Sequence, residues 1–235
     1  MAGSRSENVE REQRILDAAA DLIIRYGYDK TTMGDIADAA GIGRGVLYLH
    51  FRGKDEVLDA LIAREFPRYA QAWLEHMEAD PRGGTIGGLF RSVLYAINSS
   101  PFMTAIAKRD KGVFGSYLRR PNNIFASMQA RSISTEFARA MQEAGVIRRD
   151  IDPAVIAYVV DTLSYGLISR GDTVGWKEAP PFDDLMEAVG AMLDRALAPE
   201  GGGDVEAGKA AILRFVASAR EELEQEGRRL EGKWA

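Results

Sequence analysis

The chain has 235 residues, of which 46% are hydrophobic, a formal net charge of -5 and no cysteine. These values fit a globular protein of one large or two modest domains, exclude a disulfide framework and a thiolate metal site, and argue against an indiscriminate nucleic-acid coat. Because no apolar run reaches the ~18 to 20 residues that span a bilayer, and residues 1–13 are charged rather than typical of a signal peptide, we expect a cytoplasmic protein.

Two short patterns predict the first two helices. An apolar stripe predicts a helix that ends at Tyr26-Gly27, and its apolar positions are Ile15, Ala19, Leu22 and Ile23. The spacing of Thr32 and Asp35 is typical of a capping box, so a second helix begins there. Gly41 stands where the chain leaves this helix with a positive φ, which glycine adopts without strain.

A third helix is predicted from Gly43 to Phe51. The residues available for packing are Val46, Leu47 and Phe51, and those left on or near the open face are Arg44, Gly45, Tyr48, Leu49 and His50. Two short helices joined by a glycine turn, the second with exposed basic and aromatic groups, are typical of a DNA-binding helix-turn-helix. Arg44, Arg52 and Lys54 occur without any acidic residue between positions 42 and 54, which favours a phosphate-contacting surface.

Two other interpretations of this stretch remain open. An ordinary pair of core helices has the same alanine-rich composition, although the local excess of positive charge argues against it. Gly41, Gly43 and Gly45 also suggest a Gly-x-Gly phosphate loop. That loop follows a strand and continues to a third glycine at a different spacing, whereas here a helix precedes it.

The rest of the chain reads as further helices without a convincing strand of alternating pattern, so we expect an all-α fold. A long amphipathic helix is predicted from Asp55 to about Met77, with a kink or a break at Pro67. The following helices are predicted at residues 86–97, 101–109, 113–118, 123–144, 153–169 and 182–197. Their start and stop signals are Thr85, Ser100-Pro101, Asn122-Asn123, Asp152-Pro153, Gly145 and Gly171.

A glycine linker after Pro199 precedes an additional amphipathic helix, predicted from Asp204 to about Glu226. Its mixed charge does not favour membrane binding. We expect this helix to pack back on its own assembly, where it extends an interface or covers the neighbouring domain.

The residues from Ile15 to about Leu61 resemble the N-terminal domain of the TetR family of one-component transcriptional repressors. The matching positions are Tyr26-Gly27, Thr31-Thr32, Ile36-Ala37, Ala40-Gly41, Leu47-Tyr48, Phe51 and Lys54-Asp55. The resemblance implies a sequence-specific DNA-binding regulator, a repressor that an apolar or aromatic small-molecule effector releases from a pseudo-palindromic operator. The candidate DNA-binding residues are Thr32, Arg44, Gly45, Val46, Tyr48, Leu49, His50 and Lys54.

Three positions depart from the family pattern. Gly43 stands where a capping serine or threonine is usual, Val46 where threonine is frequent, and Leu49 where histidine, tyrosine or arginine is common. Few polar groups are then left for reading bases. Arg44 is the candidate for a guanine contact, and Val46 or Leu49 can pack on thymine methyl groups.

The resemblance also implies the domain organisation. We expect a helix-turn-helix domain at 1–55, a larger helical ligand-binding and dimerisation domain at 56–198, and the linker with the extra C-terminal helix at 199–235. The segment 154–168 is apolar on more than one side, which fits either a buried core helix or a subunit interface. The resemblance favours a homodimer with a four-helix interface, which would place two recognition helices about 34 Å apart. The candidate interface residues are Val159, Leu163, Leu167, Leu185, Val189 and Met192.

Large apolar side chains are dense in the middle of the chain. Each one alone fits an ordinary core position, whereas the resemblance implies a pocket for a hydrophobic or aromatic effector. The candidate ligand-binding residues are Trp73, Leu94, Phe102, Phe114, Tyr117, Phe125, Met128 and Tyr165.

Catalysis has little support in the sequence. His50 and His76 are the only histidines, cysteine is absent, and the two-histidine spacing of a helical zinc site does not occur. We therefore expect no enzymatic activity, no catalytic residues, no metal and no cofactor. The alternative is a helical dimeric adaptor or small-molecule-binding protein without DNA readout, which buried Arg44, Tyr48 and Lys54 side chains would favour.

Overall fold

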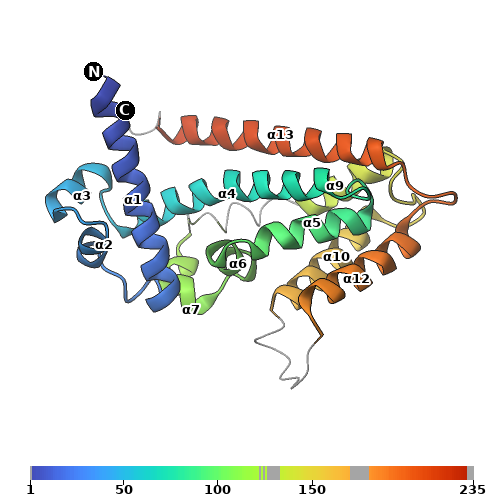
Figure 1. Cartoon of the computed structure of the whole chain (residues 1–235), viewed down its shortest axis with the longest axis horizontal. Helices are drawn as coiled ribbons and strands as arrows, with labels where there is room; N and C mark the ends of the chain where they lie inside the picture. The colour runs from blue at the N-terminus through green and yellow to red at the C-terminus, as the bar shows by residue number, and fades with distance from the viewer. Residues whose placement is uncertain (1, 122, 124, 126–132, 170–179, 232–235) are drawn as a thin grey trace. The chain divides into compact units, whose positions relative to one another are not determined.

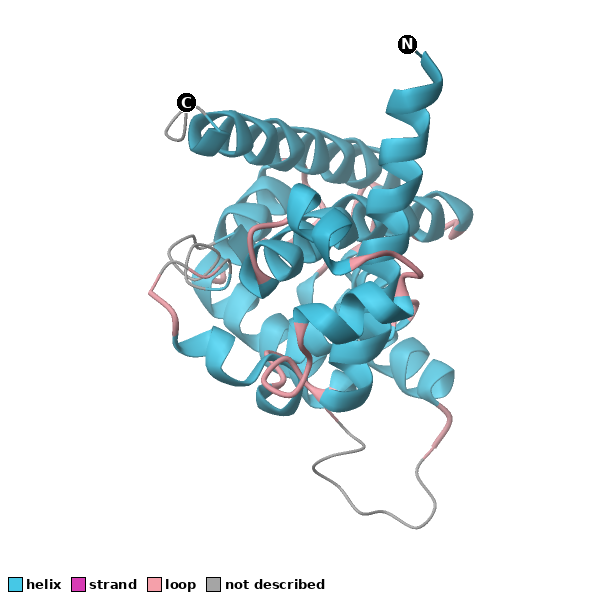
Figure 2. Ribbon diagram, turned by 90° about the vertical axis from the view of Figure 1, so that its left-hand side faces the viewer, coloured by secondary structure: helices cyan, strands magenta, loops and turns pink. Residues whose placement is uncertain are grey.

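The computed structural model describes residues 2–121, 123, 125, 133–169 and 180–231. Every regular element in these ranges is a helix, so the predicted all-α fold is confirmed (Figures 1 and 2). None of the described helices combines the length and the apolar character that crossing a bilayer requires. The chain forms two compact units, one of Met1–Phe66 with Ser100–Arg131 and the other of Pro67–Ser99 with Ser132–Ala235.

The first unit contains the predicted helix-turn-helix. Its helices are α1 (Ala2–Tyr26), α2 (Met33–Ala39), α3 (Arg44–His50), the start of α4 (Lys54–Ala79), α6 (Pro101–Lys108), α7 (Lys111–Phe114) and the 3-10 helix η1 (Gly115–Arg119). Helix α1 packs against α2, α6 and α7, and α2 packs against α3. The sequence assigns residues 101–119 to the larger domain, whereas in the structure these residues pack with the helix-turn-helix. Whether the functional domains divide at residue 55 stays a prediction.

The predicted caps around α2 are confirmed. Thr32 Oγ1 accepts from the Asp35 amide at 3.2 Å, and the Asp35 carboxylate accepts from the Thr32 amide at 2.9 Å. Gly41 has φ of +67°, and Gly43 opens α3 without a side-chain cap. The backbone thus turns tightly between α2 and α3 at the positions that the glycines indicate.

Helix α4 continues through Pro67 rather than breaking there. Pro67 nevertheless marks a change, because the boundary between the two compact units falls between Phe66 and Pro67. The N-terminal half of α4 therefore belongs to the unit with the helix-turn-helix, and its C-terminal half belongs to the second unit.

The second unit is built around α5. Its helices after the end of α4 are α5 (Ile86–Asn98), α9 (Ile133–Glu143), α10 (Pro153–Ile168), α12 (Phe182–Leu197) and α13 (Val205–Glu231). Helix α5 packs against α12 and α10, and α9 packs against α10 and α13. A Cβ atom on Gly87 would lie 2.2 Å from the Gly190 carbonyl oxygen, so α5 and α12 approach each other at a point that only glycine allows.

Most predicted helix boundaries in this half agree with the structure. Thr85, Ser100 and Asp152 cap α5, α6 and α10 through their side chains, and Gly145 has φ of +76° just after α9. The predicted start of the helix at 123–144 involves a segment that lies mostly outside the described residues, and so does Gly171, the predicted stop of the helix at 153–169. Helix α13 extends to Glu231, beyond the predicted end.

Helix α13 packs on its own chain. A Cβ atom on Gly208 would lie 2.0 Å from the Gly84 carbonyl oxygen, and Lys209 Nζ donates to the Glu78 carbonyl at 3.4 Å. The Phe215 ring meets the Phe137 ring of α9 with centroids 4.7 Å apart. The additional helix is thus an integral part of the second unit.

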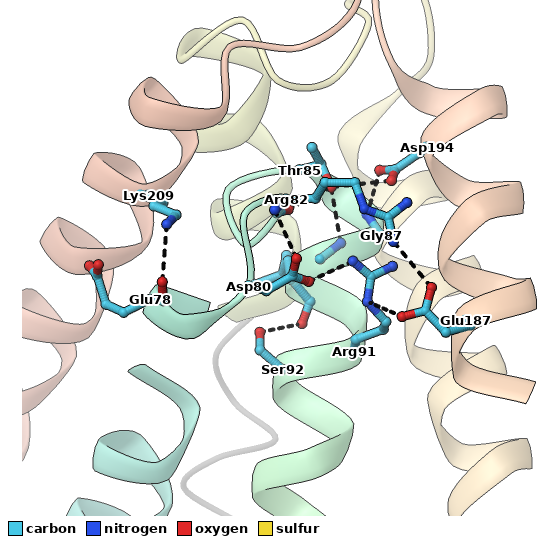
Figure 3. A network of polar contacts seen from close by, with 12 residues as sticks. Glu78, Asp80, Arg82, Thr85, Gly87, Arg91, Ser92, Glu187, Asp194 and Lys209 are labelled. Atoms are coloured by element: carbon cyan, nitrogen blue, oxygen red, sulfur yellow. Dashed lines mark hydrogen bonds and ion pairs between the residues drawn. The ribbon is translucent and has the colours of Figure 1, made fainter. Parts of the chain in front are cut away.

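A polar network around the buried Arg91 side chain joins α5, α12 and the residue after α4 (Figure 3). Arg91, whose side chain is only 4% exposed, bonds Asp80 Oδ2 through Nη2 at 2.6 Å and Glu187 Oε1 through Nε at 3.2 Å. Asp194 of α12 accepts from the Gly87 amide at 2.7 Å and from the Thr85 hydroxyl at 3.2 Å. These bonds fix α12 on α5 where the two glycines let the helices approach.

Candidate nucleic-acid interface

The outer face of α3 carries the predicted DNA-contacting groups. Arg44 and Gly45 are exposed, Tyr48 is 55% exposed and Leu49 is 86% exposed. Leu47 is buried on the opposite side and holds the helix on α2. A short helix with a buried inner side and a basic, aromatic and apolar outer side can lie in a major groove, with its exposed face toward the base edges.

The remaining α3 candidates are less exposed. Val46 and His50 are half-buried, and the His50 ring lies next to the buried Phe51 ring with centroids 6.3 Å apart. Their contribution to DNA contact stays a prediction.

The Arg44 side chain lies across the first turn of α2. A Cβ atom on Gly34 would be 2.7 Å from Arg44 Nη2, so the guanidinium uses the space that this glycine leaves. Hydrogen bonds from Thr32, together with the nearby charge of Arg44, hold the pKa of the Asp35 carboxyl below its ordinary value. The positive charge of Arg44 therefore lies where α2 begins, and its long flexible stem lets it turn toward a base or a phosphate.

Lys54 is bonded within the chain. Its ammonium group donates to the carbonyl oxygens of Tyr28 and Thr31, at 2.5 and 2.7 Å, and lies 4.1 Å from the centroid of the Tyr28 ring. Burial lowers the pKa of Lys54, although the nearby Asp29 carboxylate acts in the opposite direction. In this structure Lys54 ties the turn between α1 and α2 to the start of α4, and its direct DNA contact stays a prediction.

The cap of α2 can be tested by replacing Thr32 with alanine. The variant loses the side-chain acceptor of the capping box, so we expect the free energy of unfolding to fall by about 1 kcal/mol. Denaturant titration of the purified protein measures this change. Thr32→Ser is the matched control because it keeps the hydroxyl, and equal stability of the alanine and serine variants would contradict the role of the cap.

The predicted interface residues lie at or near the surface of the described chain. Val159, Leu163 and Met192 are exposed, and Leu167, Leu185 and Val189 are half-buried. Tyr158 was not among the predicted residues, yet at 75% it is the most exposed large apolar side chain of α10. Tyr158 directly precedes the predicted interface residue Val159, and this position in the sequence could have indicated it.

Four of the predicted ligand-binding residues form one buried aromatic cluster in the first unit. The members are Phe102, Phe114, Tyr117 and Phe125. Phe114 is central, with ring centroids 5.7 Å from Phe102 and 5.1 Å from Phe125. The sequence predicts the proximity of these side chains but not the unit that contains them.

The other ligand-binding candidates are placed elsewhere. Trp73 and Leu94 are buried in the second unit, Tyr165 is exposed there, and Met128 lies outside the described residues. Trp73 donates from Nε1 to Ser92 Oγ at 3.1 Å and belongs to a series of aromatic rings with Tyr69, Phe137 and Phe215 that sequence reasoning missed. Burial raises the pKa of Tyr69 far above its ordinary value, so its hydroxyl stays neutral and able to donate a hydrogen bond.

Comparison with known proteins decides the family. Residues 15–61 match the model of bacterial regulatory proteins of the tetR family. The transcriptional regulator TtgR of Pseudomonas putida is 34% identical over 206 residues, which cover 83% of this chain and 93% of TtgR. This chain belongs to the TetR family.

Two further similarities agree with membership of the TetR family. The transcriptional repressor Rv1474c of Mycobacterium tuberculosis is 28% identical over 166 residues, covering 68% of this chain and 81% of the repressor. The structure of the ketosteroid transcriptional regulator KstR2 from Mycobacterium tuberculosis has a TM-score of 0.55 at 20% identity and covers 80% of this chain and 95% of that one. The second likeness supports the fold alone.

The TetR-family protein is a DNA-binding transcriptional regulator, as the helix-turn-helix predicted. Members of the family bind operator DNA as homodimers and respond to small-molecule effectors. The relatives are regulators and not enzymes. Within the described ranges, no three histidine or acidic side chains group in a way that could hold a metal ion.

Proposed function

We propose that this TetR-family regulator is a repressor that binds a pseudo-palindromic operator as a homodimer and leaves it when an apolar or aromatic effector binds. The observation that carries the proposal is the outer face of α3, where Arg44, Tyr48 and Leu49 are exposed together. Exposed Arg44 and Tyr48 argue against an adaptor without DNA readout, whereas Lys54, which is half-buried and bonded within the chain, does not separate the two functions. The proposed place of action is the cytoplasm, where the operator DNA is, and we propose no catalytic activity.

The dimer is supported by an apolar stripe along α10. Val155, Val159 and Leu163 recur every four residues, so they lie on one helix face, and all three are exposed. Exposed Met192 on α12 adds to the apolar surface of the second unit. A second copy that buries such a stripe gives an isologous interface and pairs two recognition helices for successive major grooves.

The effector class is supported by the aromatic side chains of the second unit. Tyr69, Trp73, Phe137 and Phe215 follow one another in ring contact, and the first two lie on α4, which continues into the helix-turn-helix unit. Adjacent aromatic side chains with few polar groups suit contact with an apolar or aromatic ligand. Preferential binding of the ligand to one conformer of α4 would shift the population away from the operator-binding state.

The test is selection of operator DNA from a random pool by the purified protein, followed by a salt titration. We expect an enriched palindrome. Arg44→Ala should weaken binding by about 1 to 3 kcal/mol and relax one position of the site if Arg44 contacts a base, whereas a phosphate contact would weaken binding evenly. Arg214→Ala is the matched control because Arg214 is also exposed but lies on α13. A pool without any enriched palindrome would refute the proposed function.

A further inference from the structure

The segment of residues 111–120, which contains α7 and η1, is bonded to the turn that enters α2. The Asp29 carboxylate of this turn accepts hydrogen bonds from the amide of Ser116, at 3.0 Å, and from the Ser116 hydroxyl. The Tyr28 amide donates to the Val113 carbonyl at 2.7 Å. The turn is thus held by backbone and side-chain bonds from a segment more than 80 residues away in sequence.

The same segment is bonded to the start of α4. The hydroxyl of the buried Tyr117 donates to the Asp59 carboxylate, and Arg120 pairs with Asp55. Asp55 also accepts from the Tyr28 hydroxyl, so the carboxylate joins the turn, α4 and the residue that follows η1. Residues 111–120 therefore contact both the turn that precedes α2 and the start of α4, the segments on either side of the helix-turn-helix.

Two glycines make this close approach possible. Gly27 has φ of +84°, and a Cβ atom on it would lie 2.6 Å from the Gly112 carbonyl oxygen. Gly115 has φ of +46°, and a Cβ atom on it would meet the Asp29 carboxylate at 2.1 Å. A side chain at either position would clash with its neighbour and would strain the backbone, because φ is positive at both. The contact between 111–120 and the turn therefore depends on these two glycines and is a specific feature of the fold.

The turn held in this way determines where α2 begins. Thr31 precedes the capping residue Thr32, and its carbonyl is bonded by Lys54. Ser116 of η1 and Lys54 of α4 thus bind the same turn, the first at the Asp29 carboxylate and the second at the Thr31 carbonyl. Helix α2 in turn packs on α3, which connects the turn to the recognition helix.

We propose that residues 111–120 are a positioning element of the DNA-binding head, with Asp29 and Ser116 as its central pair, and that operator affinity depends on the bond between them. The proposal rests on the proposed repressor function.

The experiment is a double-mutant cycle of Ser116→Ala and Asp29→Ala in the full-length protein, with the dissociation constant of the selected operator as the readout. Ser116→Ala should bind the operator about tenfold more weakly, the factor that corresponds to one charge-assisted hydrogen bond, and Asp29→Ala, which also removes the bond from the Ser116 amide, at least as weakly. The double variant should be no weaker than Asp29→Ala alone, because that change already removes the bond that Ser116→Ala removes. Ser116→Thr keeps the hydroxyl and should retain most of the affinity, and Ser218→Ala on the exposed side of α13 is the control.

Hydrogen exchange of the free protein separates this proposal from the repressor proposal. The amides of the turn and of the start of α2, at residues 28–33, should exchange faster in Ser116→Ala than in the parent protein, with no change in α10. Parent protein that fails to select an operator would refute the repressor function, whatever the exchange shows. Parent protein that binds its operator, with variants of equal affinity and equal exchange at 28–33, would overturn the positioning role.

Discussion

Leu163→Glu is expected to give a folded monomer that binds the operator about 10² to 10⁴ times more weakly than the parent dimer. This is the factor by which linking two binding modules typically raises affinity, and the monomer has only one recognition helix. Leu163 is 38% exposed and lies on the apolar stripe of α10 with Val155 and Val159. A carboxylate on this stripe stays hydrated in a monomer. In a dimer it would be buried without a partner, at a cost that opposes association.

Sedimentation of the purified variant measures its mass, and titration with the operator measures its affinity. Leu213→Glu is a closely matched control, since Leu213 is 43% exposed on α13, outside the predicted interface. We expect the control to remain a dimer with unchanged operator affinity. A dimeric Leu163→Glu with intact affinity would show that the α10 stripe is not the interface on which DNA binding depends.

Local signals explain why the helix-turn-helix could be predicted from the sequence. Thr32 and Asp35 form a capping box across three residues, Gly41 adopts the positive φ that ends α2, and Gly43 precedes α3. Each of these signals is contained in a few consecutive positions. The extra C-terminal helix was predictable for the same reason. Its apolar residues recur at helical spacing, and the buried Ile212 is one of them.

Contacts between distant residues could not be predicted in this way. Asp29 and Ser116 have no periodic pattern that relates them, and either would also suit a solvated surface position. Lys54 was recognised as a positive charge, but its bonds to the carbonyls of Tyr28 and Thr31 depend on how α4 meets the preceding turn. The aromatic candidates were ambiguous because a ring at helical spacing looks the same in a core cluster, such as that of Phe114, as in a ligand pocket.

Asp80→Ala is expected to lower the free energy of unfolding of the second unit by about 3 kcal/mol, because it leaves the buried Arg91 guanidinium with one acidic partner. In the parent protein Arg91 Nη1 already finds no hydrogen-bond partner within the described part of the chain. The remaining partner, Glu187, is largely exposed and is shared with Arg82, so it compensates only in part. Denaturant titration near pH 7 measures the loss, and Asp21→Ala on the exposed side of α1 is the control.

The loss of stability in Asp80→Ala should become smaller as the pH falls. Burial raises the pKa of Asp80, but hydrogen bonds from Arg91 and from the Arg82 amide outweigh it, so the net pKa lies below its ordinary value. A carboxyl group whose pKa is lower in the folded state stabilises that state fully above about pH 4 and loses this contribution as the pH falls through its folded pKa. The difference in stability between the parent protein and Asp80→Ala should therefore be constant from pH 7 to about 5 and shrink below about pH 4. A difference that grows on acidification would mean that Asp80 is held protonated in the fold and that Arg91 is balanced by other groups.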